Sequence, residues 1–379
     1  MEMPFVFGKV ATGENFTDRS EETERLLQNF QGLVNTTIIS PRRWGKSSLV
    51  ARVAELIQKQ EKSLKICMID LFNVRTEEEF YTLLANSILK AVSTKWEEIV
   101  ADAKHFLGRL VPRISFSTGQ DAEVSFGVSW EELQRNPDEV LDLAEALAEA
   151  KGIRVMVCVD EFQNVAYFDD ALAFQKKLRA HWQRHSRVGY CLFGSKRHML
   201  LEVFADPSMP FYKFGDLLFL QKIAKVEWIP FIQRRFEDTG KTIDTAEAGR
   251  LVDLVDNHPY YVQQLAQQVW LRTSQKADLN LVEAAYNGLI DQLSLLFLNL
   301  METFSNAQIA FLHALIAGEK QLSSKRVLQK YTIGTSGNVV RIRQNLIERE
   351  ILDTKEDALV FQDPLFEGWL RKCYFKCGE

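Results

Sequence analysis

A segment near the N-terminus combines residue types that suit the binding of phosphate groups. The segment consists of Ser40, Pro41, Arg42, Arg43, Trp44, Gly45, Lys46, Ser47 and Ser48. A loop folded over a helix N-terminus aims several backbone N–H groups at one point, and the helix dipole adds positive potential there. Gly45 would let the backbone pass close to the phosphates, Lys46 would reach the β- and γ-phosphates, and Ser47 would place its hydroxyl on Mg²⁺. The segment therefore predicts a nucleoside triphosphate-binding loop.

One position departs from the standard pattern G-x-x-x-x-G-K-[ST], because Ser40 stands where glycine is expected. A serine would be strained there if the position requires a positive φ. The alternative interpretation of the segment is a strand–turn–helix connection with a surface lysine.

Two carboxylates, Asp160 and Glu161, directly follow the apolar run that ends at Val159. Acidic side chains are rarely buried without partners, so packing does not explain them. In a phosphate-loop protein, Asp160 would hold the Mg²⁺ shell and Glu161 would polarise the attacking water. An acidic loop that merely ends the strand is the alternative. The order of the two motifs along the chain favours the nucleotide site.

The elements that must position these residues form an alternating pattern. The apolar runs that predict strands cover residues 34–39, 64–72, 153–159, 188–193 and 217–221. Helical spacing covers residues 44–60, 77–110 and 171–185, the second stretch as one or two helices. Continuous apolar strands separated by helices indicate an α/β fold with a parallel sheet covered on both faces, as in P-loop NTPases.

Residues 113–129 break this rhythm, since apolar and polar residues alternate on each side of a turn at residues 118–122. This pattern predicts a β-hairpin inserted between the second and third strands of the core.

The strand pattern ends near Ile223. Helices predicted at residues 227–239, 245–256 and 259–274 would form a small helical lid. Helices at 306–317, 323–331 and 336–349, followed by short strands at 351–354 and 359–362, are typical of a winged helix. We therefore expect a P-loop core over 1–222, a helical lid over 223–289 and a winged-helix domain over 290–379.

The run S-P-R-R-W-G-K-S-S-L resembles the phosphate loop of the archaeal-type ATPases, usually written GPRRxGKTSL. That family belongs to the STAND branch of AAA+-like P-loop ATPases, and the resemblance covers most of the chain. It implies that Phe16 and Arg19 flank the adenine pocket, within the family's F-x-x-R-x-x-E segment. It also implies that Ser195 senses the γ-phosphate and that Pro259 starts a lid helix near the nucleotide.

Some positions depart from the family. Asn257 takes the place of the usual glycine before Pro259, and the P-L-Y-G-R segment lacks its arginine. No arginine finger can be assigned. Asp70, at the end of the second strand, would be either a strand cap or part of the nucleotide site.

Composition excludes some classes of protein. The chain has 379 residues, 46% hydrophobic, with a formal net charge of −5, which argues against a protein that coats nucleic acid with its whole surface. Its five cysteines form no disulfide framework or metal-binding spacing. No signal peptide and no apolar run of the roughly 18 residues that a membrane span needs are present. We expect a soluble, cytoplasmic protein that does not bind membranes.

The predicted recognition helix at residues 336–349 could serve either of two partners. Arg341 and Arg343 could face outward and contact DNA. Abundant acidic residues nearby favour docking to a protein, or an intramolecular role, instead.

These observations predict an ATPase that acts as a nucleotide-dependent molecular switch, with Mg²⁺ as cofactor and ATP and ADP as ligands. Lys46, Glu161 and Ser195 would be its catalytic residues. One alternative is a nucleotide-regulated DNA-binding protein with little turnover. Another is a scaffold that retains ADP structurally. Adenine is favoured over guanine only by the absence of an N/T-K-x-D segment.

Overall fold

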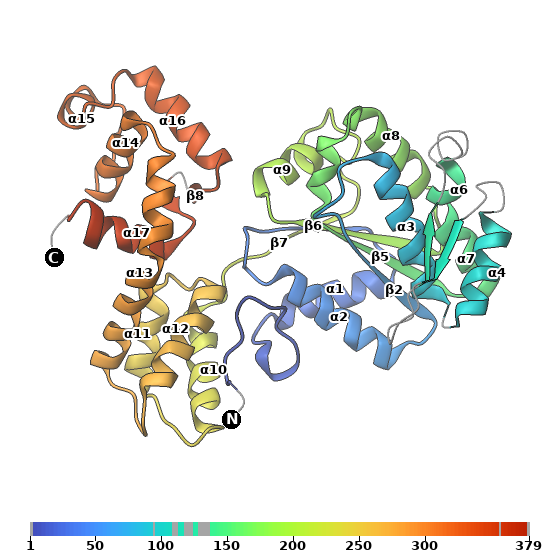
Figure 1. The fold of residues 1–379 in the computed structure, drawn as a ribbon, viewed down its shortest axis with the longest axis horizontal. Helices are drawn as coiled ribbons and strands as arrows, with labels where there is room; N and C mark the ends of the chain where they lie inside the picture. The colour runs from blue at the N-terminus through green and yellow to red at the C-terminus, as the bar shows by residue number, and fades with distance from the viewer. Residues whose placement is uncertain are drawn as a thin grey trace. The chain divides into compact units, whose positions relative to one another are not determined.

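The computed structural model describes residues 3–93, 95–107, 113–116, 124–127, 137–355 and 358–376. These residues form two compact units, each with its own hydrophobic core (Figure 1). The first unit is Thr12–Gln221. The second comprises the residues up to Ala11 together with those from Lys222 onward.

A five-stranded sheet forms the centre of the first unit. Its strands are β1 (Thr36–Ile39), β2 (Leu64–Asp70), β5 (Arg154–Asp160), β6 (Val188–Gly194) and β7 (Asp216–Phe219). The order is β2-β5-β6-β1-β7, and all four pairings are parallel, which confirms the predicted parallel sheet. The carboxyl ends of β1, β5 and β6 therefore lie at one edge of the sheet, where open α/β sheets bind ligands.

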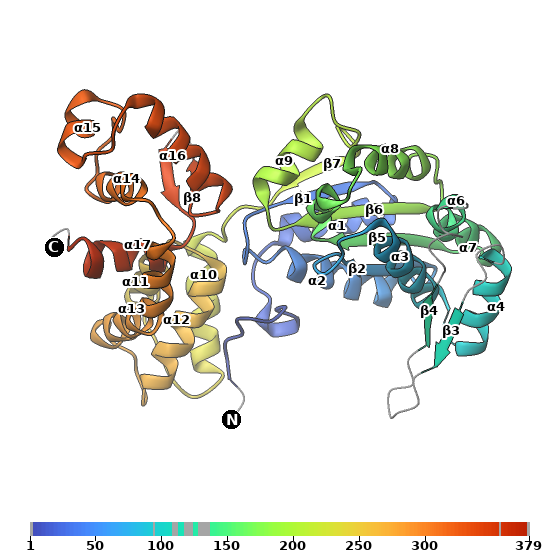
Figure 2. The same cartoon turned by 45° about the horizontal axis from the view of Figure 1, so that its top comes forward.

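Helices cover both faces of the sheet (Figure 2). One face packs against α1 (Ser20–Gln31) and α2 (Lys46–Gln60), which bury residues such as Phe30 and Val53. The opposite face packs against the α3–α9 series. This series consists of α3 (Glu77–Val92), α4 (Trp96–Phe106), α6 (Pro137–Leu141), α7 (Leu143–Lys151), α8 (Ala171–Trp182) and α9 (Arg197–Ala205). Short 3-10 helices, η1 (Gly13–Asn15) and η3 (Phe162–Tyr167), complete the unit.

The predicted β-hairpin is present. Its strands β3 (Arg113–Phe116) and β4 (Val124–Gly127) pair antiparallel, with Arg113 opposite Gly127. The predicted turn at residues 118–122 lies outside the described residues.

The second unit is mainly helical. Its elements are α10 (Lys225–Glu237), α11 (Thr245–Leu254), α12 (Pro259–Arg272), α13 (Leu279–Glu302), α14 (Asn306–Ile316), α15 (Lys325–Tyr331), α16 (Ser336–Glu348), β8 (Leu352–Lys355), β9 (Ala358–Phe361), α17 (Pro364–Trp369) and η4 (Leu370–Tyr374). The three helices α14, α15 and α16 followed by the antiparallel pair β8–β9 have the predicted winged-helix order.

The second unit has one continuous core, in which side chains of α10–α13 and of α14–α17 belong to the same cluster. Helix α13 runs without a break through residues 289 and 290, where we expected the boundary between lid and winged helix. It packs on α11 and α12 and also on α17. The exact boundary therefore stays a prediction.

The N-terminal segment belongs to the second unit, although the sequence pattern grouped it with the core. Phe5 is buried against Phe231 and Phe236, with ring centroids 6.2 and 5.8 Å away. The carbonyl of Pro4 accepts a hydrogen bond of 2.6 Å from Arg235 Nε. These contacts explain why the segment up to Ala11 packs with residues that follow Lys222.

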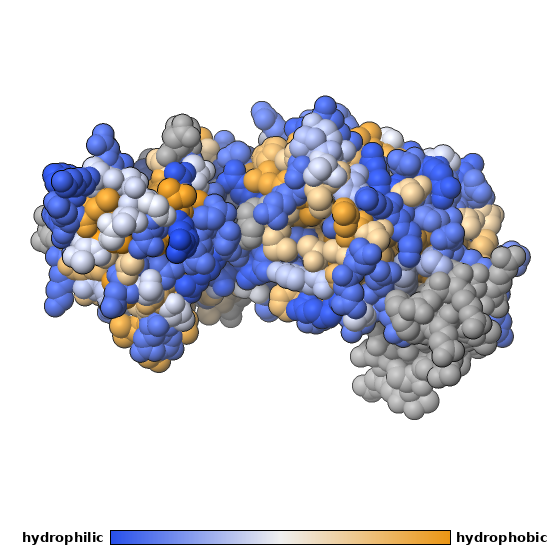
Figure 3. All heavy atoms as spheres, turned by 90° about the horizontal axis from the view of Figure 1, so that it is seen from above, coloured by the Kyte–Doolittle hydropathy of each residue, from blue (hydrophilic) through white to orange (hydrophobic). Residues whose placement is uncertain are grey.

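None of the helices in the described ranges combines the length and the apolar character needed to cross a bilayer. On the face seen in Figure 3, hydrophobic residues are interspersed with hydrophilic ones.

Candidate functional site

The predicted phosphate loop connects β1 to α2 at the carboxyl edge of the sheet. Gly45 caps α2 with φ of 92°, in the left-handed region that favours glycine, and Arg43 has φ of 64°. Ser40 is buried, its hydroxyl donates to the carbonyl of Pro41 at 3.2 Å, and it is not among the described residues with positive φ. The serine is therefore accommodated without the backbone strain that its departure from glycine suggested.

Lys46 and Ser47 are the first two residues of α2. Lys46 is 6% exposed, which is unusual for a lysine and places its charge within the site. The Ser47 hydroxyl donates a 2.9 Å hydrogen bond to Asp160 Oδ2. This contact joins the phosphate loop to the acidic end of β5, so the two predicted motifs form one site.

Asp160 ends β5 and is mostly enclosed. Burial raises the pKa of its carboxyl group, while the hydrogen bond from Ser47 and the charge of Lys46 act in the opposite direction. Its Oδ1 atom accepts a hydrogen bond of 2.8 Å from the backbone N–H of Glu161. A buried carboxylate of this kind is stabilised by an added cation.

The Ser47 hydroxyl and the Asp160 carboxylate are hard oxygen donors side by side, the chemistry that Mg²⁺ prefers. Within the described ranges, no group of three or more His, Cys, Asp and Glu side chains is arranged to hold a metal ion. Mg²⁺ in nucleotide sites is commonly held by one or two protein oxygens together with phosphates and waters. The residues present fit that type of site and do not form an all-protein cage.

Glu161 sits in a hydrogen-bonded chain that begins in the phosphate loop. Its backbone is left-handed, with φ of 54°. Arg42 Nε donates to Ser195 Oγ at 3.1 Å, and Ser195 Oγ in turn donates to Glu161 Oε2 at 2.9 Å. The structure therefore brings Ser195, at the end of β6, together with both the loop and the acidic pair.

Gln163 is a site residue that sequence reasoning missed. Its side chain is fully buried, its amide donates to Glu161 Oε2, and its own Oε1 has no hydrogen-bond partner. A Cβ atom at Gly194 would lie 1.9 Å from that Oε1, so glycine at the end of β6 makes room for the glutamine. The available signal was a pair of polar residues, Gln163 and Asn164, inside an otherwise apolar stretch.

Arg19 lies against the loop backbone. It is 2% exposed, with one terminal nitrogen 2.9 Å from Glu22 Oε1 and the other 2.9 Å from the carbonyl oxygen of Trp44. Burial lowers the pKa of its guanidinium, and Glu22 opposes that shift. Phe16 is half-buried and packs against the core on the α1–α2 face of the sheet. Their predicted roles beside adenine stay predictions.

Two other predicted residues, Asp70 and Pro259, lie on β2 and α12. Asp70 is register partner to Asp160 and accepts a 2.9 Å hydrogen bond from the backbone N–H of Phe72, as a strand cap does; its alternative role in the nucleotide site stays a prediction. Pro259 is the first residue of α12 and belongs to the second unit. Asn257 lies two residues before Pro259. It has φ of 56° and so adopts the conformation that the expected glycine would supply. The predicted nucleotide contact of Pro259 stays a prediction.

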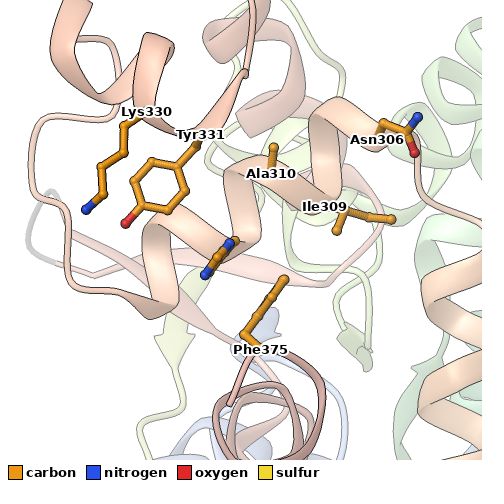
Figure 4. A pocket seen from close by; sticks show the side chains of 7 residues that line it. Asn306, Ile309, Ala310, Lys330, Tyr331 and Phe375 are labelled. Carbon is orange, nitrogen blue, oxygen red and sulfur yellow. The ribbon is translucent and has the colours of Figure 1, made fainter. Parts of the chain in front are cut away.

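The winged-helix part contains a hollow of about 580 Å³ (Figure 4). The His313 ring stacks on Phe375 with centroids 4.4 Å apart and contacts the edge of Tyr331. Lys330 on the rim pairs with Glu319 at 3.0 Å. The described lining residues include no carboxylate, so this hollow lacks the metal-binding chemistry of a site for a triphosphate and Mg²⁺.

Comparison with known proteins agrees with this fold. The chain shares 18% identity with a Walker-type ATPase of Pyrococcus abyssi, at a TM-score of 0.68, over 97% of this chain and 100% of that chain. The fold is that of a P-loop ATPase with a winged helix. The pattern of the family described as "Probable winged helix domain" matches residues 295–372. A search of curated proteins found no match.

Two further structures are similar over nearly the whole chain. The ORC2 protein of Aeropyrum pernix, solved as ADPNP–ADP complexes, has 17% identity and a TM-score of 0.55 over 96% of this chain and 94% of that chain. The ORC1 protein of Aeropyrum pernix in complex with DNA has 12% identity and a TM-score of 0.50 over 100% and 99%. At these identities the likeness establishes the fold, and it confirms the resemblance at that level.

Proposed function

We propose that this chain binds ATP with Mg²⁺ at the loop formed by residues 40–48 and hydrolyses it to ADP and phosphate. The observation that carries the proposal is the hydrogen bond from Ser47 to Asp160, because it joins the phosphate-binding helix terminus to the acidic strand end. The similarity in fold to a Walker-type ATPase and to a protein solved with ADPNP and ADP supports it.

In this proposal the N-terminus of α2 and Lys46 bind the β- and γ-phosphates. Ser47 and Asp160 would hold Mg²⁺, which when bound supplies charge neutralisation for the phosphates. Glu161 orients the attacking water and accepts its proton, the water oxygen bonds to the γ-phosphorus, and the bond to the β–γ bridging oxygen breaks. Ser195 couples the γ-phosphate to Glu161: its hydroxyl donates a hydrogen bond to that carboxylate, so a contact of Ser195 with the γ-phosphate would change the position of Glu161.

The same network supports a role as a nucleotide-dependent switch. Arg42 belongs to the phosphate loop and bonds to Ser195, so a γ-phosphate that attracts either group alters the chain that ends at Glu161. The helices of residues 223–289 would act as a lid whose contacts differ between ATP and ADP, and the winged helix would transmit the change to a protein partner. A ligand moves such an equilibrium only through differential contacts with the two states.

The test is phosphate release with Mg²⁺ and ATP from wild type, Glu161→Gln and a matched control, Glu348→Gln, which alters an exposed glutamate of α16. We expect Glu161→Gln to be slower by about a hundredfold or more, as for loss of a general base, and the control to match wild type. Equal, background-level rates for wild type and Glu161→Gln would overturn the hydrolysis proposal.

A second candidate function is DNA binding regulated by nucleotide, with little turnover. The winged-helix match over residues 295–372 and the similarity to ORC1 solved with DNA favour it. Arg341 and Arg343 are exposed on α16, where they could reach phosphates or base edges. The helix also exposes Glu348, which weakens the attraction to DNA.

This candidate is tested by measuring affinity for duplex DNA at several salt concentrations. Arg341→Ala should lower the affinity and reduce the salt slope by about one if the arginine contacts a phosphate. Absence of any binding at low salt would leave the protein-docking role of the winged helix.

A further inference from the structure

We propose that Arg19 is a positioning residue that fixes the phosphate loop through its backbone, so that it serves the triphosphate rather than the base. This inference rests on the proposed nucleotide site and assigns a role that differs from the adenine-pocket role implied by family resemblance. It is carried by the contact between the Arg19 guanidinium and the carbonyl of Trp44.

The side chain of Arg19 is held in place before any ligand arrives. It is 2% exposed, and it caps α1 with φ of 68° directly after Asp18, whose φ is 55°. Two successive non-glycine residues in the left-handed region are strained, and such strain persists only where the surrounding structure over-determines it. The local backbone conformation therefore holds the guanidinium of Arg19 against the phosphate loop.

The two terminal nitrogens of the guanidinium bind different partners. One terminal nitrogen bonds to Glu22 Oε1 and the other to the carbonyl oxygen of Trp44, both at 2.9 Å. Because a guanidinium is a rigid planar fork, the bond to Glu22 fixes the direction of the N–H group that meets Trp44. Glu22 also compensates the buried charge. Each terminal nitrogen thus makes one hydrogen bond to a protein group.

The carbonyl of Trp44 belongs to the peptide unit that ends in the N–H of Gly45. In a trans peptide the C=O and N–H groups point in opposite directions, and the described chain has no cis peptide bond. Holding the Trp44 carbonyl on Arg19 therefore directs the Gly45 N–H to the opposite side, as a phosphate cradle requires.

A glycine in this position makes such a restraint necessary. Gly45 has φ of 92°, and apart from its own atoms and its two chain neighbours no heavy atom of the described residues lies within 4 Å of the place where its Cβ would be. Glycine populates positive and negative φ with similar ease, so the peptide unit before it can rotate unless its carbonyl is held. Arg19 supplies that hold with a charged donor in a buried setting, where hydrogen bonds are strong.

The experiment compares the binding of Mg²⁺–ATP with that of Mg²⁺–tripolyphosphate, which lacks the nucleoside. The variants are Arg19→Met, Arg19→Lys and the matched control Arg25→Met. Arg25 lies on the same helix, but its half-exposed side chain pairs with Asp216 instead of the loop. Calorimetry would give the dissociation constants, and amide hydrogen exchange would report on the Gly45 N–H.

Arg19→Met should weaken both ligands by the same factor, about tenfold to a hundredfold for loss of a charge-assisted hydrogen bond, and should speed exchange at Gly45. Arg19→Lys should be intermediate, and Arg25→Met should leave both constants within about twofold of wild type. If Arg19→Met does not fold, Arg19→Lys is used instead. An equal loss of affinity for ATP and for tripolyphosphate in that variant supports the positioning role, and a loss for ATP alone contradicts it.

Two outcomes would overturn the inference. Weaker ATP binding with unchanged tripolyphosphate binding would assign Arg19 to the nucleoside. Unchanged affinities and unchanged exchange at Gly45 would remove any positioning role. Failure of the wild-type protein to bind ATP is a separate result, and it would overturn the proposed function itself.

Discussion

The phosphate-loop edge of the sheet and the exposed face of α16 both carry arginines and polar side chains, but they differ in burial and in backbone geometry. At the sheet edge, Arg19, Lys46 and Gln163 are buried, and the backbone of Glu161 is left-handed. On α16 the backbone is regular helix, the buried side chains are apolar, and Arg341 is exposed.

Burying polar groups and holding the backbone in rare conformations both reduce the stability of the folded state. Exposed charges on a helix change that stability very little. At the sheet edge, the contacts of the buried polar groups fix their positions, as a binding or catalytic site requires. The face of α16 is compatible with several partners, because its two arginines, Arg341 and Arg343, are exposed. The predictions below test this difference, beginning with the largest effect.

Removal of the buried lysine should abolish ligand binding. At an ATP concentration of about 100 times Kd, wild type should gain about 2.7 kcal/mol of stability, and Lys46→Ala should gain none. The measurement is the nucleotide-induced rise in melting temperature, with Arg341→Ala as the control that keeps the full rise. A retained rise in Lys46→Ala would place the nucleotide elsewhere.

The same substitution, glycine to alanine, should have opposite effects in the two regions. In Gly194→Ala the new Cβ would meet Gln163 Oε1, so we expect a loss of about 1–3 kcal/mol in the free energy of unfolding. In Gly337→Ala, within α16, the nearest atom is 3.9 Å away, and we expect a gain of about 0.5 kcal/mol. Denaturant unfolding measures both, and equal losses would contradict the distinction.

Helix α1, which Arg19 caps, is also anchored by an ion pair that titrates, between Arg25 and Asp216 at the amino end of β7. Hydrogen bonds from Arg25 and Asn29 lower the pKa of Asp216 below its ordinary value near 3.8. A lowered pKa means that the contribution is fully present above the unfolded-state value and is lost as pH falls through the folded-state value.

Asp216→Asn should therefore reduce stability at neutral pH by less than about 1 kcal/mol, because Arg25 is half-exposed. The difference from wild type should disappear as pH falls below about 3.8. Melting temperatures measured from pH 7 downward check this, and a difference that grows in acid would contradict the sign.

The smallest effect is expected on α16 itself. Arg341→Ala and Arg343→Ala should each change the free energy of unfolding by no more than about 0.5 kcal/mol, as is usual for exposed positions. A loss above 1 kcal/mol in thermal unfolding would show that the arginine supports the domain rather than a partner.

The sequence predicted the sheet well because its strands are continuous apolar runs with clear ends. Residues 153–159 and 188–193 are predicted as strands; the observed β5 is shifted by one residue at both ends, and β6 is one residue longer at its carboxyl end. The phosphate loop and Asp160 were identified by local spacing alone. The hydrogen bond from Ser47 to Asp160 then confirmed that they meet.

The features of the site and fold that the sequence did not predict depend on contacts between residues far apart in the chain. Gln163 matters because Gly194, on another strand, leaves room for its amide. Arg19 meets Trp44 across a separation of 25 residues, and neither residue type predicts that contact. Helix α13 was not predicted as one element, because it packs on helices that the pattern assigned to different domains, α11 and α12 on one side of the expected boundary and α17 on the other.

The burial of Phe5 among residues of α10 has a consequence for the connectivity of the chain. The polypeptide leaves the second unit after Ala11 and returns to it at Lys222, so the ATPase core is an insertion within the second unit. Two covalent connections, rather than one, restrain any rotation between the units. A fragment that starts at residue 222 would also lack the ring that fills the space between Phe231 and Phe236.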